Sequence, residues 1–228
     1  MERQPEPEHM DDPAEAAAYA GADFSQVNAA FVARLLELTE AIERCYAVDL
    51  GTGPGDIAIR VARARPMWRV IGIDASDAML GFAREEATRL SSPQARQIAN
   101  LSFRRSDVKA TGLAAQSIDL IFSNSLLHHM PDPQPMWREI VHIARPGAVL
   151  FLRDLLRPAS SERAREIVQT YAGGESPLLQ EEFYRSLLSA FSIDEIVAQI
   201  ADVAGLEGMR VEQVTDRHVD VRGVFPAL

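Results

Sequence analysis

The sequence predicts an α/β fold in which a doubly wound, mostly parallel sheet carries helices on both faces. Between residues 46 and 157, short apolar runs alternate with helix-forming segments, and such alternation is typical of a parallel sheet. Two short apolar runs near the C-terminus are close enough in sequence to pair as a hairpin, which predicts an antiparallel edge. The length of 228 residues suits a single domain with a sizeable core.

The individual elements follow from local patterns. Strands are expected at residues 46–51, 69–75, 101–107, 117–124, 147–155, 209–215 and 218–225, and helices at 13–20, 25–44, 56–64, 76–90, 93–99 and 132–144. Residues 158–191 read as purely helical. The tetrapeptide "SIDE" at 192–195 is a capping box that opens a further helix, which Gly205 is expected to close. The acidic first dozen residues are expected to form a flexible, solvated tail, and residues 13–228 a single domain.

Composition argues against several classes of partner. The formal net charge of -10 would repel nucleic-acid phosphates and anionic lipids, and the cluster Arg60, Arg63, Arg65 and Arg69 is expected to be a solvated face. Cys45 is the only cysteine, so no internal disulfide is expected and a reducing compartment fits. No apolar run approaches the roughly 20 residues of a membrane span. We therefore expect a cytoplasmic protein without a nucleic-acid or membrane partner.

The loop "AVDLGTGPGD" at residues 47–56 is the strongest single signal for a ligand. Its glycines form G-x-G-x-G, whereas a dinucleotide fold uses G-x-G-x-x-G, and no G-K-[ST] follows as in a phosphate-binding loop. Asp49 and Asp56 flank the glycines and would repel a pyrophosphate. A ligand with a primary ammonium and a positive sulfur, S-adenosylmethionine (SAM), would instead be attracted.

Two further acids stand where the nucleoside of such a ligand should lie. Asp74 ends the next strand, 23 residues beyond Gly51, at the distance where an α/β unit places an acid to accept hydrogen bonds from the ribose hydroxyls. Asp107 ends the third strand and can accept from the exocyclic amine of adenine. These positions predict a binding site for an adenosine-containing ligand.

With these residues the sequence resembles the class I SAM-dependent methyltransferases. The segments "AVDLGTGPGD", "VIGIDASDAML", "RRSDV", "IDLIFSNSLLHHMPDP" and "IARPGAVLFLRDL" match the successive motifs of that family between residues 46 and 157. The nearest branch methylates small molecules and resembles the quinone C-methyltransferases. The resemblance implies a Rossmann-like, seven-stranded sheet with an antiparallel C-terminal hairpin strand and SAM as cofactor.

The resemblance also implies which part of the cofactor each residue would contact. Asp49, Gly51, Thr52, Gly53 and Gly55 would lie near the methionine moiety, Asp74 on the ribose, Ala75 and Met79 against the adenine, Asp107 and Val108 at the adenine edge, and Asn124 and Ser125 beside the methyl group. The helices in residues 13–45 would form a lid over the methionine end. Tyr19 is placed to reach the carboxylate of the cofactor, with Phe24 packed beside it.

Four residues are candidates for a catalytic or acceptor-binding role: His129, Arg153, Asp154 and Tyr184. Each has a structural alternative. The pair His128–His129 could order the loop after the fourth strand, Arg153 and Asp154 could pair structurally, and Tyr184 could belong to the core. The helical insert 158–208 is expected to cover the acceptor, and no metal site is expected.

These observations predict a SAM-dependent methyltransferase that acts on a small-molecule acceptor by in-line displacement, and that could be a homodimer. A SAM-binding regulator or an enzyme that remodels SAM stays open as an alternative. A nicotinamide oxidoreductase is opposed by the glycine spacing. The sequence predicts neither the acceptor nor the atom that is methylated.

Overall fold

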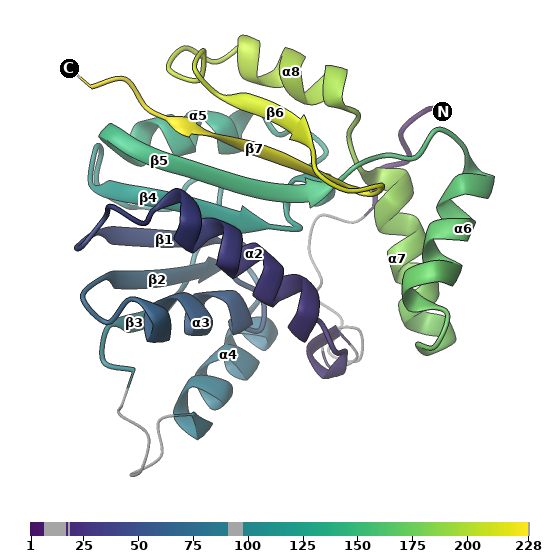
Figure 1. The fold of residues 1–228 in the computed structure, drawn as a ribbon, viewed down its shortest axis with the longest axis horizontal. Helices are drawn as coiled ribbons and strands as arrows, with labels where there is room; N and C mark the ends of the chain where they lie inside the picture. The colour runs from purple at the N-terminus through teal and green to yellow at the C-terminus, as the bar shows by residue number, and fades with distance from the viewer. Residues whose placement is uncertain (7–16, 18, 91–97, 228) are drawn as a thin grey trace.

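The structure is a computed structural model that describes residues 1–6, 17, 19–90 and 98–227 (Figure 1). Its strands are β1 (Tyr46–Leu50), β2 (Arg69–Asp74), β3 (Leu101–Arg105), β4 (Ile118–Asn124), β5 (Ala144–Leu155), β6 (Arg210–Gln213) and β7 (His218–Val224). Its helices are α2 (Ser25–Leu38), α3 (Asp56–Ala64), α4 (Asp77–Arg89), the 3-10 turn η1 (Leu127–His129), α5 (Gln134–Ile143), α6 (Ser161–Ala172), α7 (Pro177–Ser189) and α8 (Ile193–Ala201). The predicted helix at 93–99 and most of that at 13–20 lie outside the described residues.

The seven strands form one sheet in the order β3-β2-β1-β4-β5-β7-β6. Strands β1 to β5 pair in parallel, whereas β7 pairs antiparallel with both β5 and β6. The order reverses direction at β1, so a crevice is expected at the carboxyl ends of β1 and β4. The predicted α/β fold with a mixed edge is confirmed.

Successive residues of the central strands face opposite layers of helices, as the pleat of a strand requires. On β5, Phe151 packs against α2 and α3, and its ring lies 4.7 Å from that of Phe31 on α2. Its neighbours Leu150 and Leu152 pack on the other face, against α5 and α8, where Trp137 is fully buried. The sheet is therefore the middle layer of three.

Helix α2 ends at Leu38, six residues before the predicted end. The Thr39 hydroxyl donates to the Leu35 carbonyl at 2.7 Å, and Arg65 donates to the Leu36 carbonyl at 3.2 Å. Because side chains satisfy carbonyls that another turn of helix would have used, the chain can leave the helix and cross to β1. The predicted capping box at Ser192 and Glu195 is confirmed, but α8 ends at Ala201. Gly205, at φ +101°, belongs to the turn that follows.

Helices α6 and α7 form a pair at the end of the sheet to which the parallel strands point (Figure 1). Ser160 and Ser176 cap the two helices with their hydroxyls, and residues of both helices bury a separate apolar cluster with Leu155. The first six residues of the chain dock beside α7: the Gln4 amide donates to the Leu188 carbonyl at 3.0 Å. These contacts differ from the solvated tail expected for residues 1–12, of which residues 7–12 lie outside the described part.

Candidate active site

A cavity lies at the carboxyl ends of the central parallel strands. Its wall includes Asp49 of β1, Asp74 of β2 and Asn124 of β4, while Phe24 and Asn28 close it from the start of α2. All the residues expected to contact SAM line this cavity except Gly55. The structure thus brings together residues that lie as far apart in sequence as 19 and 125. Their individual contacts with a cofactor stay predictions.

The three glycines of the loop after β1 serve different purposes. All three have positive φ angles, which L-residues with side chains rarely adopt. A Cβ on Gly51 would lie 2.7 Å from the Leu126 side chain, whereas one on Gly53 would meet nothing within 4 Å. At Gly55 a Cβ would lie 2.8 Å from that of Ala83. Gly55 therefore permits α3 to approach α4 and does not line the cavity, and its contact with the cofactor stays a prediction.

Asp49 is buried at the floor of the cavity, where its side chain is 2% exposed. The hydroxyl of Thr52 donates to Asp49 Oδ2 at 2.8 Å. Burial raises the pKa of Asp49 to about 7, since the hydrogen bond from Thr52 compensates only part of the lost hydration and Asp74 adds negative charge. A bound cation would favour the ionised form of this carboxyl.

Asp74 is held in a fixed orientation at the rim of the same cavity. The Gly53 amide donates to Oδ2 at 2.8 Å and the Ser76 amide donates to Oδ1 at 2.9 Å. Burial raises the pKa of Asp74, while these backbone donors oppose the rise. The Ala75 amide acts as a third backbone donor, and because a carboxylate offers about four lone-pair sites, acceptor capacity is left for a ligand.

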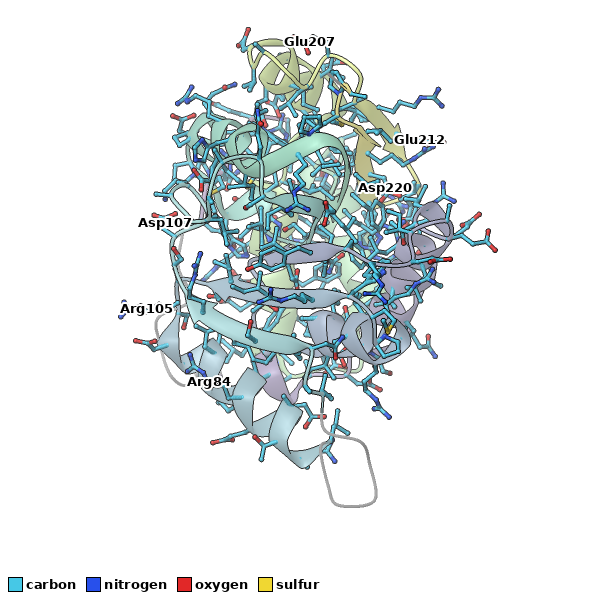
Figure 2. All side chains as sticks on the ribbon, turned by 90° about the vertical axis from the view of Figure 1, so that its left-hand side faces the viewer. Arg84, Arg105, Asp107, Glu207, Glu212 and Asp220 are labelled. Atoms are coloured by element: carbon cyan, nitrogen blue, oxygen red, sulfur yellow. The ribbon has the colours of Figure 1, made fainter. Side chains whose placement is uncertain are left out.

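The adenine end of the cavity is built by the loops that follow β2 and β3. The Ser76 hydroxyl accepts from the Met79 amide and caps α4, which fixes Met79 in the wall. Asp107 follows β3 (Figure 2), accepts from the Lys109 amide at 2.8 Å and lines the cavity with Val108. An apolar wall beside a carboxylate acceptor suits a flat base with an exocyclic amine.

The residues after β4 bring a strained backbone and an imidazole to the wall of the cavity. Ser125 has a φ of +57°, an unusual conformation for a residue other than glycine, asparagine or aspartate. His129 and Met130 also line the cavity, while His128 is buried behind them. Strained residues of this kind concentrate at functional sites.

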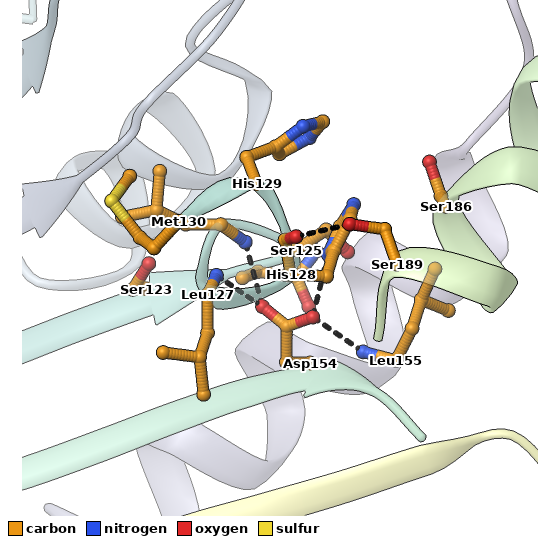
Figure 3. Close-up of polar contacts among 12 residues, drawn as sticks. Ser123, Ser125, Leu127, His128, His129, Met130, Asp154, Leu155, Ser186 and Ser189 are labelled. Carbon is orange, nitrogen blue, oxygen red and sulfur yellow. Dashed lines mark hydrogen bonds and ion pairs between the residues drawn. The ribbon is translucent and has the colours of Figure 1, made fainter. Parts of the chain in front are cut away.

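Asp154 holds the turn after β4, which contains η1, by several hydrogen bonds, and it does not line the cavity. It accepts from the amides of Leu126, Leu127 and Leu155 at 2.8, 2.6 and 2.7 Å, and its Oδ1 lies 2.6 Å from His128 Nδ1 (Figure 3). Burial acts to raise the pKa of Asp154, but His128 and the amide donors outweigh it and the pKa is lowered. For His128, burial acts to lower the pKa, yet Asp154 and Glu6 outweigh it and the pKa is raised. The two form a buried ion pair that positions η1.

Arg153 and Tyr184 have partners elsewhere, and neither lines the cavity. Arg153 forms a bidentate pair with Asp220 of β7 at 2.6 and 2.8 Å, and Figure 2 shows Asp220 on the opposite side of the view from Asp107. Tyr184 packs with the apolar cluster of α6 and α7, beneath the guanidinium of Arg165. Arg153, Asp154 and Tyr184 thus have structural partners and do not line the cavity, and a catalytic role for them stays a prediction. His129 alone of the four candidates faces the cavity.

Sequence reasoning missed two polar residues near the site. Asn28 donates to Asp56 at 2.9 Å across the cavity mouth, and Glu6 Oε1 lies 3.1 Å from His129 Nδ1. Asn28 carries a weak signal, since it follows Phe24 by one helical turn. Glu6 carries none, because its acidic surroundings are typical of a solvated tail.

Comparison with known proteins identifies the family. A family model described as a methyltransferase domain matches residues 43–187. The chain belongs to this methyltransferase family. The family expected from the motifs is thereby confirmed, and the alternative of a non-methyltransferase is not favoured.

Curated relatives carry the names of small-molecule methyltransferases. Trans-aconitate 2-methyltransferase of Deinococcus radiodurans is 30% identical over 175 residues, covering 68% of this chain and 62% of the relative. The 27-O-demethylrifamycin SV methyltransferase of Amycolatopsis mediterranei is 29% identical over 171 residues, covering 74% and 56%. The chain thus spans less than two thirds of the length of these relatives. Neither name is that of a quinone C-methyltransferase, so resemblance to that branch stays a prediction.

Solved structures show the same fold at low identity. A SAM-dependent methyltransferase from Aquifex aeolicus superposes with a TM-score of 0.66 at 19% identity, covering 94% of this chain and 98% of the other. Magnesium protoporphyrin IX methyltransferase from Synechocystis, solved with bound S-adenosylhomocysteine (SAH), gives 0.59 at 19% identity, covering 88% and 82%. The Rossmann-like methyltransferase fold is confirmed. Among the described residues, no helix is both long and apolar enough to cross a membrane.

Proposed function

We propose that this chain is a SAM-dependent methyltransferase that transfers a methyl group to a small-molecule acceptor. The observation that carries the proposal is the carboxylate of Asp74, held by two backbone amides at the rim of a cavity with a positive-φ glycine loop. None of the described residues that line the cavity is a lysine or arginine. Asp49 and Asp56 stand there instead, which favours a cationic ligand over a pyrophosphate.

The residues of the cavity fit the cofactor part by part. When bound, SAM supplies a methyl group activated by a positively charged sulfur. Asp74 would accept from the ribose hydroxyls, and Asp49 would lie near the positive methionine end. Asp107 would accept from the exocyclic amine of adenine, while Asn124 and Ser125 would lie beside the methyl group. The protein contributes chiefly by alignment and by exclusion of water.

Two segments supply the cover that exclusion of water requires. Tyr19 lines the cavity with its ring 4.8 Å from that of Phe24, and we infer that residues 19–24 act as a lid over the methionine end. The pair α6 and α7 stands at the same edge of the sheet (Figure 1), and we infer that the insert 158–208 limits the acceptor to a small molecule. With one buried cysteine, the cytoplasm suits this enzyme, and a homodimer is a further possibility that light scattering decides.

Turnover tests the proposal directly. The purified protein is incubated with SAM and a panel of small hydroxyl, amine and carboxylate acceptors, and SAH is measured by mass spectrometry. An enzyme releases SAH in proportion to methylated product, and the Asp74→Ala variant releases far less at low SAM. A protein that binds SAM tightly but forms no methylated product with any acceptor would be a sensor, which defeats the proposal.

A further inference from the structure

The N-terminal residues are fastened to the wall of the active site by polar contacts on several sides. Arg3 donates to the carbonyls of Ser189, His128 and Met130 at 2.6, 3.0 and 2.9 Å, and its guanidinium lies 3.7 Å from the centre of the Phe191 ring. The Glu6 amide donates to the Ser189 hydroxyl at 3.3 Å. These contacts place Glu6 beside His128 and His129, in the turn after β4.

The carboxylate of Glu6 is aimed at His129. Its side chain is only 8% exposed, and Oε1 lies 3.1 Å from His129 Nδ1 and 3.6 Å from His128 Nε2. The Ser186 hydroxyl donates to the same oxygen at 3.1 Å. Burial acts to raise the pKa of Glu6, but the hydrogen bond with His129 and the charge of His128 outweigh it, so the pKa is lowered. Glu6 is therefore an ionised acceptor.

An ionised acceptor at Nδ1 fixes the tautomer of a neutral imidazole. Nδ1 carries the hydrogen and donates it to Glu6, so Nε2 keeps a free lone pair. The ring that presents this nitrogen lines the cavity beside Asn124 and Ser125. Burial and the neighbouring charge of His128 lower the pKa of His129, against the effect of Glu6. His129 is thus neutral at neutral pH and able to accept a proton.

We propose that Glu6 is a positioning residue that orients His129 as the general base for an acceptor that carries its proton in solution, a hydroxyl or an amine. This inference rests on the proposed function and names its substrate class. His129 Nε2 takes the proton from the acceptor, and the electron pair of the acceptor atom forms the bond to the methyl carbon. The pair of the broken carbon–sulfur bond stays on sulfur in SAH. His129 returns its proton to water after the product leaves.

A carboxylate acceptor would need no such base, since it is already ionised at neutral pH. His129 as a base and Glu6 as its positioning residue would then have no role in the reaction. The same three side chains, Glu6, His128 and His129, also offer donor atoms within 4.8 Å of one another that could hold a metal ion. The positive charge of Arg3, which acts on both His128 and Glu6, opposes a divalent cation there.

Several charged groups face His129 and set its titration. They are Glu6 and His128 in contact, Asp154 behind the turn, and Asp74 across the cavity. Because Glu6 favours the protonated form of His129, its removal lowers the pKa of the ring. The rising limb of the rate against pH therefore moves to lower pH. At the plateau, loss of orientation lowers kcat by about 10- to 100-fold, within the range of general-base effects.

The test that needs no acceptor is nitrogen NMR of the histidines in the full chain with SAH bound. The wild type should show His129 neutral at pH 7.5 with hydrogen on Nδ1. Glu6→Met, which lacks an acceptor, should lose this tautomer and lower the pKa. Glu6→Gln should restore the tautomer but not the pKa, because it keeps an acceptor oxygen without charge. Glu2→Met, an exposed acid in the same segment, is the matched control.

Three results would overturn the inference. They are a wild-type His129 with hydrogen on Nε2, a tautomer that Glu6→Met leaves unchanged, and a stoichiometric metal ion that Glu6→Met releases from the purified protein. In the turnover screen, methylation of carboxylates alone would also overturn it. Failure of SAM turnover altogether defeats the proposed function instead, and the NMR result still decides whether Glu6 orients His129. The kcat profile of Glu6→Met, taken with a hydroxyl acceptor found in the screen, completes the test.

Discussion

Asp74→Ala removes the carboxylate that we assign to the ribose of the cofactor. In the free protein each carboxylate oxygen already accepts one backbone amide, from Gly53 and from Ser76. The Ala75 amide adds a third backbone donor to this carboxylate, and we assign its remaining acceptor capacity to the two vicinal hydroxyls of the ribose. The variant therefore loses two hydrogen bonds to a charged group, each worth roughly 1.5–3 kcal/mol.

The lower limit, about 3 kcal/mol for the pair, corresponds to a loss of roughly 100-fold in affinity at about 1.4 kcal/mol per tenfold. Water that enters the vacated space recovers part of this loss, so the expected change in Kd is at least about tenfold. The fold should survive, because the carboxylate is desolvated in the free protein, as its raised pKa shows. The two amides that lose their acceptor lie at a cavity that water can reach.

Isothermal calorimetry with SAH measures the change, and thermal melting checks the fold. Asp77→Ala is the matched control: Asp77 lies three residues further along the chain and pairs with Arg105 at 2.9 Å, but both side chains are 65% exposed. Such a pair contributes little, and Asp77 does not line the cavity. A Kd for Asp74→Ala within twofold of the wild type, with an unchanged melting temperature, would refute the ribose assignment.

Three other expectations follow from the site and its surroundings. SAH affinity should rise with pH and level off above about pH 7, because the pKa of Asp49 is raised to about 7 and its ionised form favours the ammonium group; calorimetry in Asp49→Asn should give a flat profile. Arg153→Leu should lower the free energy of unfolding by about 3 kcal/mol in urea titrations, because it leaves Asp220 buried without its partner. The affinity for SAH should stay unchanged. A weakened SAH affinity would show that Arg153 belongs to the cofactor site. Tyr19→Phe should weaken SAH by about 0.5–1.5 kcal/mol for one hydrogen bond, and truncation of residues 1–28 by tenfold or more; tight binding by the truncated chain would disprove the lid.

Most of the cofactor side could be predicted from the sequence because its geometry is local. The loop after β1 connects adjacent elements, so the spacing of Gly51 and Gly53 defines its backbone directly. Asp74 ends a strand that neighbours β1 in the sheet, and parallel strands place their carboxyl ends at one edge. The residues near the cofactor therefore follow from the order of strands without any tertiary detail.

The acceptor side could not be predicted in the same way, because its contacts join distant segments. Glu6 and His129 meet only because Arg3 and Gln4 dock beside α7, and no local pattern in an acidic segment indicates that docking. Arg153 pairs with Asp220 through the register of β5 against β7. A sequence with two candidate strands does not reveal which residues face each other across them.

Adjacent residues at the end of β5 show why a strand-end motif indicates a region rather than a role. Side chains alternate between the two faces of a sheet, so Arg153 and Asp154 turn to different partners. Arg153 lies directly opposite Asp220 on β7, whereas Asp154 reaches the turn after β4 and binds three amides and His128. Asp154 does not line the cavity, yet it fixes the backbone from which His129 projects. Its removal should therefore disturb the geometry of the acceptor side without removing any contact to the cofactor, and a strand-end acid of this kind acts on catalysis only through the loop that it holds.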